Sequence, residues 1–349
     1  MLIIFAAFKK EAENLLKLIN CQKIIKDSNT IIYIGKIRNK KIIVCITGMG
    51  KSNSLNGASK IIQMINQMKL DNPVFLIQGI SGALVENLKI GDLVVYESIQ
   101  NLEQFQISRQ IKEKKYDMEE TDNNKDLSNQ NTEKDIPDED DKEEEFNKIW
   151  GLPYNSRLTK NEIDKLSKYF NVFNREEIQT VTEINNKNFD FLKNVNKNLR
   201  GNYNISRVPA ALVSDVIRDY KDKKALNKLF GVETVDMESY YIADIAQKNN
   251  IPVICIRAIS DDLFESVPDY FSGSDFEEST KKSYIKTSAN HKMIKYFNKA
   301  YKLSGMLFKI IFSKSEIKAI LKTLKNINIA CKNLNNFVIE MVLPYFDYK

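Results

Sequence analysis

Two carboxylates frame one helix–strand unit of this chain, and together they could support bond cleavage by acid–base catalysis. Glu238 stands at the start of an expected helix, and Asp261, preceded by Ser260, stands at the end of an expected strand. Ligands of open α/β sheets bind at the carboxyl ends of the strands. A hydrolase or a glycosyl-transferring enzyme needs one acid held protonated and another held ionised. We therefore expect a functional site here, although a helix cap and a strand-end turn would explain the same pattern.

The spacing of apolar residues predicts the two elements that position these carboxylates. After Glu238, apolar side chains recur at helical spacing until Asn249-Asn250. Pro252 then precedes a β-rich run, Val253–Ile256, which leads toward Asp261. The periodic helix residues are Tyr241, Ile242, Ile245 and Ala246.

Five motifs occur along the chain in a characteristic order. They are Ala6–Glu11, Thr47–Lys51, Gly79–Leu84 continued by Leu88–Val95, Val235–Ser239, and Arg257–Asp261. In sequence and order they resemble the purine nucleoside phosphorylase and nucleosidase superfamily, and more narrowly its methylthioadenosine/S-adenosylhomocysteine nucleosidase branch. The resemblance covers residues 1–100 and 205–265. It implies an α/β, three-layer nucleoside phosphorylase-like fold, with a central mixed sheet flanked by helices and a helical C-terminal tail.

The resemblance also implies a role for each candidate site residue. Asp261 matches the acid that protonates purine N7, and Ser260 is expected to orient it by a hydroxyl hydrogen bond. Glu238 matches the carboxylate that accepts hydrogen bonds from the ribose hydroxyls. Met237 matches the residue that packs beside the sugar. Glu11 matches the base that activates the attacking water. Cleavage needs these functions because positive charge develops on the ribose and negative charge on the leaving base.

One glycine-containing segment and one loop bear on the substrate. Gly79, Ile80 and Ser81 match the family's glycine loop, whose backbone amides are expected to approach the ligand. Nucleosidases tend to have a small or hydroxyl residue where Ile80 stands. Ser81 can provide the missing hydroxyl contact to water or phosphate only if the loop shifts. The segment Ser214–Arg218 lacks the aromatic residue that stacks on adenine in nucleosidases. The sequence therefore supports the reaction class better than the substrate.

The sequence predicts hydrolysis of a purine nucleoside, with 5′-methylthioadenosine or S-adenosylhomocysteine as expected substrates. Glu11 favours water as the nucleophile, because a phosphorylase must instead bind a phosphate anion. Lys9 and Lys10 flank Glu11, so a phosphate-dependent phosphorylase acting on an adenosyl compound is one alternative. A non-catalytic nucleoside-binding protein is a second alternative. The presence of Glu11, Glu238 and Asp261 together argues against this second alternative, because a binding protein needs no catalytic acid and base.

Composition argues against metal, cofactor and nucleic-acid chemistry. The single histidine, His291, and four widely spaced cysteines predict no metal centre, no Ser-His-Asp triad and no disulfide frame. Cys45 and Cys255 lie in β-rich runs and are expected to be buried thiols. Gly50-Lys51-Ser52 is not a P-loop, because Cys45 stands where that motif needs glycine. The lysine-rich C-terminal part carries no nucleic-acid motif, so we expect no nucleic-acid partner.

The expected setting is the cytoplasm, and the expected assembly, by resemblance alone, is a homodimer. The apolar segment at the start of the chain is short, because Lys9 and Lys10 follow it directly. A secretion signal would have a longer apolar segment and a cleavage site. The longest apolar stretch, Leu303–Phe312, is too short to span a bilayer.

The expected domain plan is one nucleoside phosphorylase-like domain over residues 1–278, followed by a basic helical C-terminal extension over 279–349. An acidic insert at about 109–149 interrupts the domain. Its central part, Lys112–Glu145, holds almost no large apolar residue, and we expect it to be disordered because it cannot bury enough surface to fold. Further helices are expected over residues 158–170, 186–199, 280–301 and 315–342.

Overall fold

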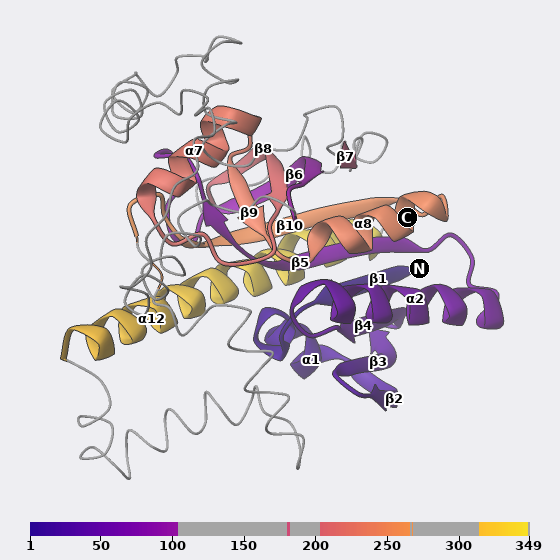
Figure 1. Ribbon diagram of the computed structural model, residues 1–349. Helices are drawn as coiled ribbons and strands as arrows, with labels where there is room; N and C mark the ends of the chain where they lie inside the picture. The colour runs from indigo at the N-terminus through magenta and orange to yellow at the C-terminus, as the bar shows by residue number, and fades with distance from the viewer. Residues whose placement is uncertain (104–179, 182–202, 266, 268–313, 348–349) are drawn as a thin grey trace, which may run out of the picture.

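The computed structural model of the protein describes residues 1–103, 180–181, 203–265, 267 and 314–347 (Figure 1). The acidic insert at about 109–149, the helices expected over 158–170, 186–199 and 280–301, and His291 all lie outside the described residues. The expectations for them, including disorder of the insert, stay predictions.

The described part of the chain contains both strands and helices. The strands are β1 (Leu2–Ala6), β2 (Asn20–Asp27), β3 (Thr30–Ile37), β4 (Lys40–Ile46), β5 (Val74–Ala83), β6 (Leu93–Asn101), β7 (Thr180–Val181), β8 (Ile205–Leu212), β9 (Thr234–Asp236) and β10 (Val253–Asp261). The helices are the 3₁₀ helix η1 (Lys9–Ala12), α1 (Glu13–Leu18), α2 (Gly50–Met68), α7 (Tyr220–Phe230), α8 (Ser239–Lys248), α12 (Lys314–Phe337), the π-helical segment η4 (Val338–Val342) and α13 (Leu343–Asp347).

All described strands join one mixed sheet. The order is β10-β6-β8-β9-β5-β1-β4-β3-β2, with β7 beside β6 and an additional parallel pairing of β10 with β5. This extra pairing closes β5, β10, β6, β8 and β9 into a ring, from which the other strands extend as an open sheet. Strand β1, at the junction, is parallel to both β4 and β5. The carboxyl ends of β1, β4, β5 and β10 therefore meet at one edge.

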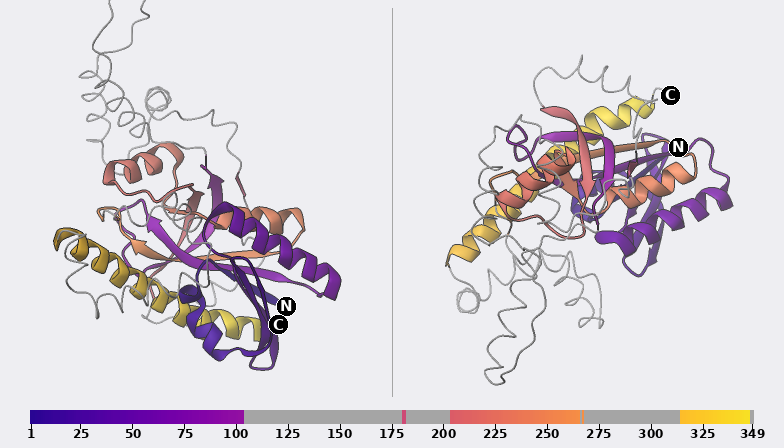
Figure 2. Two further views of the ribbon diagram at one scale, coloured as in Figure 1. Left: turned by 60° about the horizontal axis from the view of Figure 1, so that its bottom comes forward. Right: turned by 45° about the horizontal axis from the view of Figure 1, so that its top comes forward.

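Side chains of the buried strands point alternately into two apolar cores, one on each face of the sheet. On β1, Ile3 and Phe5 point into one core, whereas Leu2 and Ile4 point into the other, as the two-residue period of a strand requires. Helices α2 and α8 cover the first core, and α1 and α12 cover the second. Figures 1 and 2 show these helices on opposite sides of the sheet. The expected three-layer α/β architecture is confirmed.

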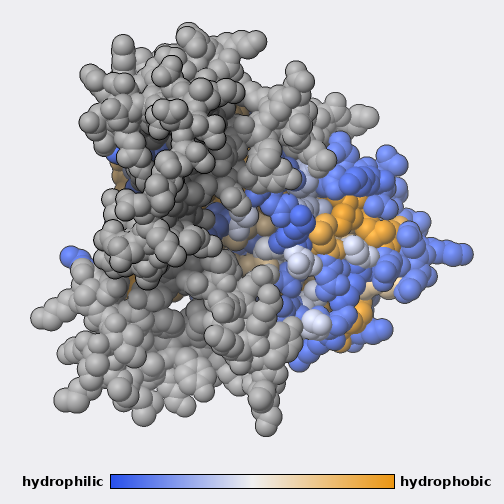
Figure 3. Space-filling view, viewed as in Figure 1, coloured by the Kyte–Doolittle hydropathy of each residue, from blue (hydrophilic) through white to orange (hydrophobic). Residues whose placement is uncertain are grey.

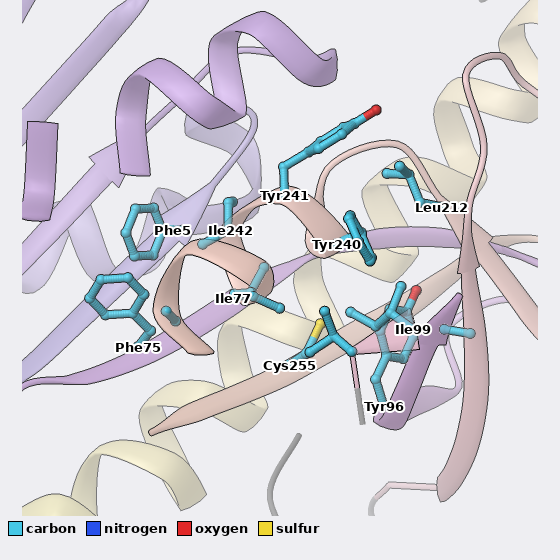
Figure 4. Close-up of a cluster of buried hydrophobic side chains, with 14 of the residues drawn as sticks. Phe5, Phe75, Ile77, Tyr96, Ile99, Leu212, Tyr240, Tyr241, Ile242 and Cys255 are labelled. Atoms are coloured by element: carbon cyan, nitrogen blue, oxygen red, sulfur yellow. The ribbon is translucent and has the colours of Figure 1, made fainter. Parts of the chain in front are cut away.

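The first core contains most of the aromatic residues at the centre of the fold. Phe5 and Phe75 pack with ring centroids 4.7 Å apart. Tyr240 and Tyr241 of α8 belong to the same cluster and pack on it from the helix. Tyr96 of β6 belongs to it as well (Figure 4). This packing fixes α8 against the sheet, and the start of α8 is where Glu238 lies.

The C-terminal helix is an integral layer of the fold. The helix expected over residues 315–342 is observed as α12, which continues through η4 into α13. Ala330, Leu334, Phe337 and Val338 are buried in the second core. The lysine-rich part of the chain thus supplies the apolar face that covers one side of the sheet.

Two details of the sequence-based expectation are wrong. Residues Gly79–Gly82 do not form a loop, because β5 continues through them to Ala83 and pairs there with β10 and β9. Strand β2 was not expected, since it is exposed along nearly its whole length and shows no buried face. It is held by its antiparallel pairing with β3.

The described surface on the side seen in Figure 1 is mainly hydrophilic, with hydrophobic patches between hydrophilic residues (Figure 3). Among the described residues, no helix combines the length and apolarity that crossing a membrane requires. The expected homodimer stays a prediction.

Candidate active site

Glu11 lies just beyond the end of β1, and its side chain is only 1% exposed. Its Oε2 accepts hydrogen bonds from the backbone N–H groups of Ala7 (2.8 Å) and Phe8 (3.0 Å), and its Oε1 accepts one from Ile80 (3.0 Å). Burial raises the pKa of Glu11 above its usual value, although the neighbouring Arg257 and these amides act in the opposite direction. A raised carboxyl pKa suits a group that must take up a proton near neutral pH.

Arg257 of β10 is the buried cation next to Glu11. Its Nε lies 3.3 Å from Asp236 Oδ2, and its Nη2 lies 4.0 Å from Glu238 Oε2. Nε and Nη2 also donate to Ser239 Oγ at 3.0 and 2.5 Å, and Nη1 donates to the Ile80 carbonyl at 3.3 Å. Each guanidinium nitrogen therefore contacts a protein oxygen.

Asp236, rather than Glu238, caps helix α8. Its Oδ1 accepts hydrogen bonds from the backbone N–H groups of Glu238 (2.9 Å) and Ser239 (2.8 Å). The Glu238 side chain makes no capping bond and instead accepts one from the Gly50 N–H, at 3.0 Å. The interpretation of Glu238 as a helix cap is therefore wrong, and its carboxylate is available for another purpose.

The electrostatics of Glu238 resemble those of Glu11. Burial raises the pKa of Glu238 to about 7, Arg257 opposes the shift, and Asp236 adds to it. Glu11 contributes to the same upward shift, so the two carboxylates lie close enough to feel each other's charge. The structure thus brings Glu11 and Glu238 together around Arg257.

Gly79 makes this cluster possible by leaving room on β5. A Cβ atom built on Gly79 would collide with the Arg257 guanidinium and would lie 2.8 Å from Glu11 Oε1. Any other residue at this position would push the arginine or the glutamate aside. The glycine is thus explained by a close approach of side chains, although the expected loop is absent.

Asp261 lies at the end of β10, where it pairs with Gly82 of β5. Its side chain is 13% exposed, and a Cβ on Gly82 would lie 2.9 Å from Asp261 Oδ2. The Ser260 hydroxyl donates to Asp261 Oδ1 at 2.9 Å, as the sequence analysis expects, and lies 3.2 Å from the Ser81 carbonyl. Gly82 also pairs with Val235 of β9, three residues before Glu238. The sheet therefore places Asp261 and Glu238 at one edge, without a direct contact between them among the described residues.

Lys223 of α7 is a further charged residue at this edge, and it was not among the expected site residues. Its side chain is 0% exposed. The ammonium group donates to Asp261 Oδ2 at 2.6 Å and to the carbonyl oxygens of Asp262 and Glu265 at 2.7 and 3.1 Å. Helix α7 starts at Tyr220 because Asp219 caps it, and this start sets the position of Lys223 in the first turn.

A sequence signal for Lys223 exists. Leu226 and Phe230, three and seven residues later, are buried on the same helix face, so Lys223 occupies a position where an apolar residue is expected. Arg257 could have been found in the same way, as a charged residue inside a strand that is otherwise apolar. In both cases the charge of a buried cation requires an anionic partner nearby.

The remaining expected site residues lie near these groups. Met237 is half-buried between Asp236 and Glu238, and Ser81 is buried on β5. Lys9 is exposed, and the Lys10 ammonium forms an ion pair with Glu13 at 2.9 Å. Among the described residues, neither ammonium group forms an ion pair with Glu11.

The cysteines and possible metal ligands add no chemistry to the site. Cys45 and Cys255 are buried and free, and burial raises the pKa of each thiol to about 12, which disfavours the reactive thiolate. Within the described ranges, no group of three or more histidine, cysteine or acidic side chains is arranged to hold a metal ion.

Comparison with known proteins yields one family and several similar chains. A model of the phosphorylase superfamily matches residues 2–290. A 5′-methylthioadenosine/S-adenosylhomocysteine nucleosidase of Haemophilus ducreyi is 28% identical over 98 residues, and one of Staphylococcus epidermidis is 28% identical over 95 residues. These alignments cover 28% and 27% of this chain and 40% of each of the two relatives.

Solved structures show the same fold at low sequence identity. The nucleosidase of the same name from Neisseria meningitidis, in complex with methylthio-immucillin-A, has a TM-score of 0.53 and 14% identity, with 98% of this chain and 97% of that chain covered. A Helicobacter pylori nucleosidase has a TM-score of 0.51 and 17% identity, with 97% of both chains covered. The expected nucleoside phosphorylase-like fold is therefore confirmed.

Proposed function

Because this chain belongs to the phosphorylase superfamily, we propose that it hydrolyses the N-glycosidic bond of a purine nucleoside. The proposed substrates are 5′-methylthioadenosine and S-adenosylhomocysteine, which give the similar curated relatives their names. The observation that carries the proposal is the fully buried Glu11, held by three backbone amides and placed beside Arg257 and Glu238.

Glu11 is proposed to activate the attacking water. The three amides fix both oxygens of its carboxylate, so the group is oriented before the substrate arrives. Burial raises its pKa, which increases its tendency to accept a proton from water. Arg257 offsets part of the cost of burying this charge without neutralising the base.

Glu238 is proposed to accept hydrogen bonds from the ribose hydroxyls, with Met237 packed beside the sugar. The Gly50 N–H donates to Oε1 of the Glu238 carboxylate, and Arg257 Nη2 lies 4.0 Å from Oε2. As the ribose ring becomes cationic, hydrogen bonds from its hydroxyls to an anionic acceptor strengthen. Gly79, Ile80 and Ser81 of β5 are proposed to form the wall of the site between Glu11 and Asp261.

Asp261 is proposed to protonate the leaving base, and Ser260 to orient it. The exposed part of its side chain is the surface available to a purine. The hydroxyl of Ser260 fixes Oδ1 from the protein side. Protonation of the base is needed because a purine anion is a poor leaving group.

A phosphorylase is the weaker alternative. Phosphate binding requires cationic or N–H donors that are not already engaged. Arg257 contacts Asp236, Glu238 and Ser239, and Lys10 pairs with Glu13. A phosphate dianion beside Glu11 would also be repelled by like charge.

Incubation of the purified protein with 5′-methylthioadenosine, with and without phosphate, tests the proposal. We expect release of adenine and free methylthioribose at a rate that does not depend on phosphate. Methylthioribose 1-phosphate as the main product would establish the phosphorylase instead. Binding of the nucleoside without turnover under both conditions would indicate a binding protein. A homodimer in the cytoplasm is the proposed form in which the enzyme acts.

A further inference from the structure

The C-terminal helix α12 contacts the short segment that carries Glu11. Asn335 lies in the last turn of α12 and is only 2% exposed. Its Nδ2 donates to the Lys10 carbonyl oxygen, and its Oδ1 accepts from the Asn14 N–H, both at 3.1 Å. Lys10 precedes Glu11 directly, and Asn14 follows it by three residues. One side chain of α12 therefore binds the backbone on both sides of Glu11.

Asn335 satisfies backbone groups at the junction of η1 and α1. The first N–H groups of a helix have no partner within that helix. Helix α1 follows Ala12, whose side chain offers no cap, so Asn335 supplies the acceptor that an N-cap side chain would otherwise supply. The same amide group also donates to the Cys331 carbonyl of α12 at 2.7 Å, and this bond fixes its orientation. One side chain thus binds the end of η1 and the start of α1 to α12.

The other side of the segment is bound to the sheet. Gln78 of β5, which is 1% exposed, donates from Nε2 to the Glu11 carbonyl oxygen at 2.7 Å. Ile80 of the same strand donates from its backbone to Glu11 Oε1. Strand β5 is paired with both β1 and β10, so the sheet sets its position. Glu11 therefore lies where contacts from the sheet and from α12 meet, and a shift of η1 would change the distance from its carboxylate to the Ile80 N–H.

Neighbouring asparagines of α12 provide a comparison. Asn333 donates to the Gly91 carbonyl at 2.9 Å, in a different part of the chain. Asn336, the direct neighbour of Asn335, is half-buried and accepts from the Asn14 side chain at 3.4 Å. Asn336 therefore contacts the same segment through a side-chain bond, whereas Asn335 binds its backbone.

We infer that Asn335 is a positioning residue for Glu11, because it holds η1 so that the Glu11 carboxylate stays where it can take a proton from the attacking water. This inference rests on the proposed function, in which Glu11 is the base. Asn335 acts on the reaction through the backbone at Lys10 and Asn14, and not by contact with the reacting atoms. A displacement of about 1 Å can lower the rate of a catalysed step about 10²-fold. Helix α12 thus contributes to catalysis in addition to covering the sheet.

Steady-state kinetics with 5′-methylthioadenosine test this role. Asn335→Leu keeps the branched shape of the side chain but removes its donor and its acceptor, and Asn335→Ala removes them without added bulk. We expect kcat to fall by roughly 10- to 100-fold in both variants. KM should stay within about twofold of the wild-type value, because Glu11 is proposed to act on water and not to hold the nucleoside. Asn336→Leu is the matched control and should leave kcat unchanged.

Three kinetic results would overturn the inference. They are an equal decline of kcat in Asn336→Leu, a rise of KM without a change of kcat in the Asn335 variants, and a wild-type kcat in both Asn335 variants.

A double-mutant cycle shows whether Asn335 acts through Glu11. In Glu11→Gln the base is already lost, so the further change Asn335→Leu should alter the residual rate by less than about threefold. An equal fold loss in both backgrounds would mean that Asn335 supports the fold as a whole, and the inference would be wrong. Wild-type activity of Glu11→Gln itself would instead refute the role of Glu11 in the proposed function.

Amide hydrogen exchange tests the inference without turnover. The N–H groups of Ala7 and Phe8 bind the Glu11 carboxylate, so their exchange rates report whether that carboxylate is held in place. We expect exchange at both amides to accelerate by about tenfold or more in Asn335→Leu, and to stay unchanged in Asn336→Leu.

The amide of Ile4, within β1, is the internal reference for global unfolding. Equal acceleration at Ile4 would assign the effect to loss of stability of the whole fold and would overturn the inference. Unchanged exchange at Ala7 and Phe8 would overturn it as well, even if the variant is inactive. Failure of the wild type to cleave the nucleoside would refute the proposed function, whereas the exchange result would still show whether Asn335 holds the Glu11 segment.

Discussion

The two halves of the candidate site balance charge in different ways. Glu11 and Glu238 are both buried, and they share one cation, Arg257, which is also engaged by Asp236. Asp261 is partly exposed and has a cation of its own, Lys223. Burial raises the pKa values of the two glutamates despite the shared arginine, whereas Asp261 accepts a hydrogen bond from a lysine of its own at 2.6 Å. The carboxyl groups of one candidate site thus lie in two different electrostatic settings.

Replacement of Glu11 should have the largest effect on this arrangement. Glu11→Gln removes the group that accepts a proton from water, and we expect adenine release from 5′-methylthioadenosine to fall by roughly 10³-fold or more. The amide keeps the volume of the side chain, so thermal melting should confirm that the fold is retained. Activity within about tenfold of the wild type would remove Glu11 from the role of base.

Replacement of Asp261 should have the next largest effect. Asp261→Asn removes the acidic proton but keeps a carbonyl oxygen for Ser260, and we expect turnover of purine nucleosides to fall by roughly 10²-fold. Cleavage of p-nitrophenyl riboside should decline much less, because its leaving group needs no acid. An equal decline with both substrates would mean that Asp261 positions the ribose or the loop instead.

Glu238→Gln should discriminate between substrates. A hydrogen bond to a charged acceptor contributes about 1.5–3 kcal/mol, so the variant should lose roughly 10-fold or more with ribosides. The loss should be smaller with 2′,3′-dideoxy analogues, which lack the hydroxyls. Steady-state rates with matched pairs of nucleosides measure this difference, and equal losses would contradict ribose binding by Glu238.

The smallest expected effect is a gain in stability. The pKa of Glu238 is raised by folding to about 7, so its ionisation costs folding free energy that is absent at low pH and fully present above pH 7. Glu238→Gln should therefore raise Tm by a few degrees at pH 8 relative to its effect at pH 5, from a contribution of up to roughly 3 kcal/mol. Glu13→Gln is the control, because the pKa of Glu13 is lowered by Lys17 and Lys10 and no such gain is expected. A pH-independent effect on Tm would contradict the raised pKa.

Much of the fold could be predicted because burial leaves a pattern in the sequence. The hairpin of β3 and β4, helix α2 and the α8–β10 unit follow from alternating or helical apolar spacing. Strand β2 could not be predicted in this way, because it is almost entirely exposed and is part of the sheet through its pairing with β3. The extension of β5 through Gly79–Gly82 was also missed, because glycines usually interrupt strands.

The sequence by itself determined which acids could act and which elements carry them: Glu11 after the first strand, Glu238 before a helix, and Asp261 at the end of a strand. Only the tertiary structure decided how deeply these acids are buried and which cations they face. Arg257 of β10 lies 4.0 Å from Glu238, which follows β9, and Lys223 of α7 binds Asp261, 38 residues later in the chain. Spacing along one chain cannot reveal such pairs, because they form where separate elements pack together. Burial at that point sets the cost of each charge.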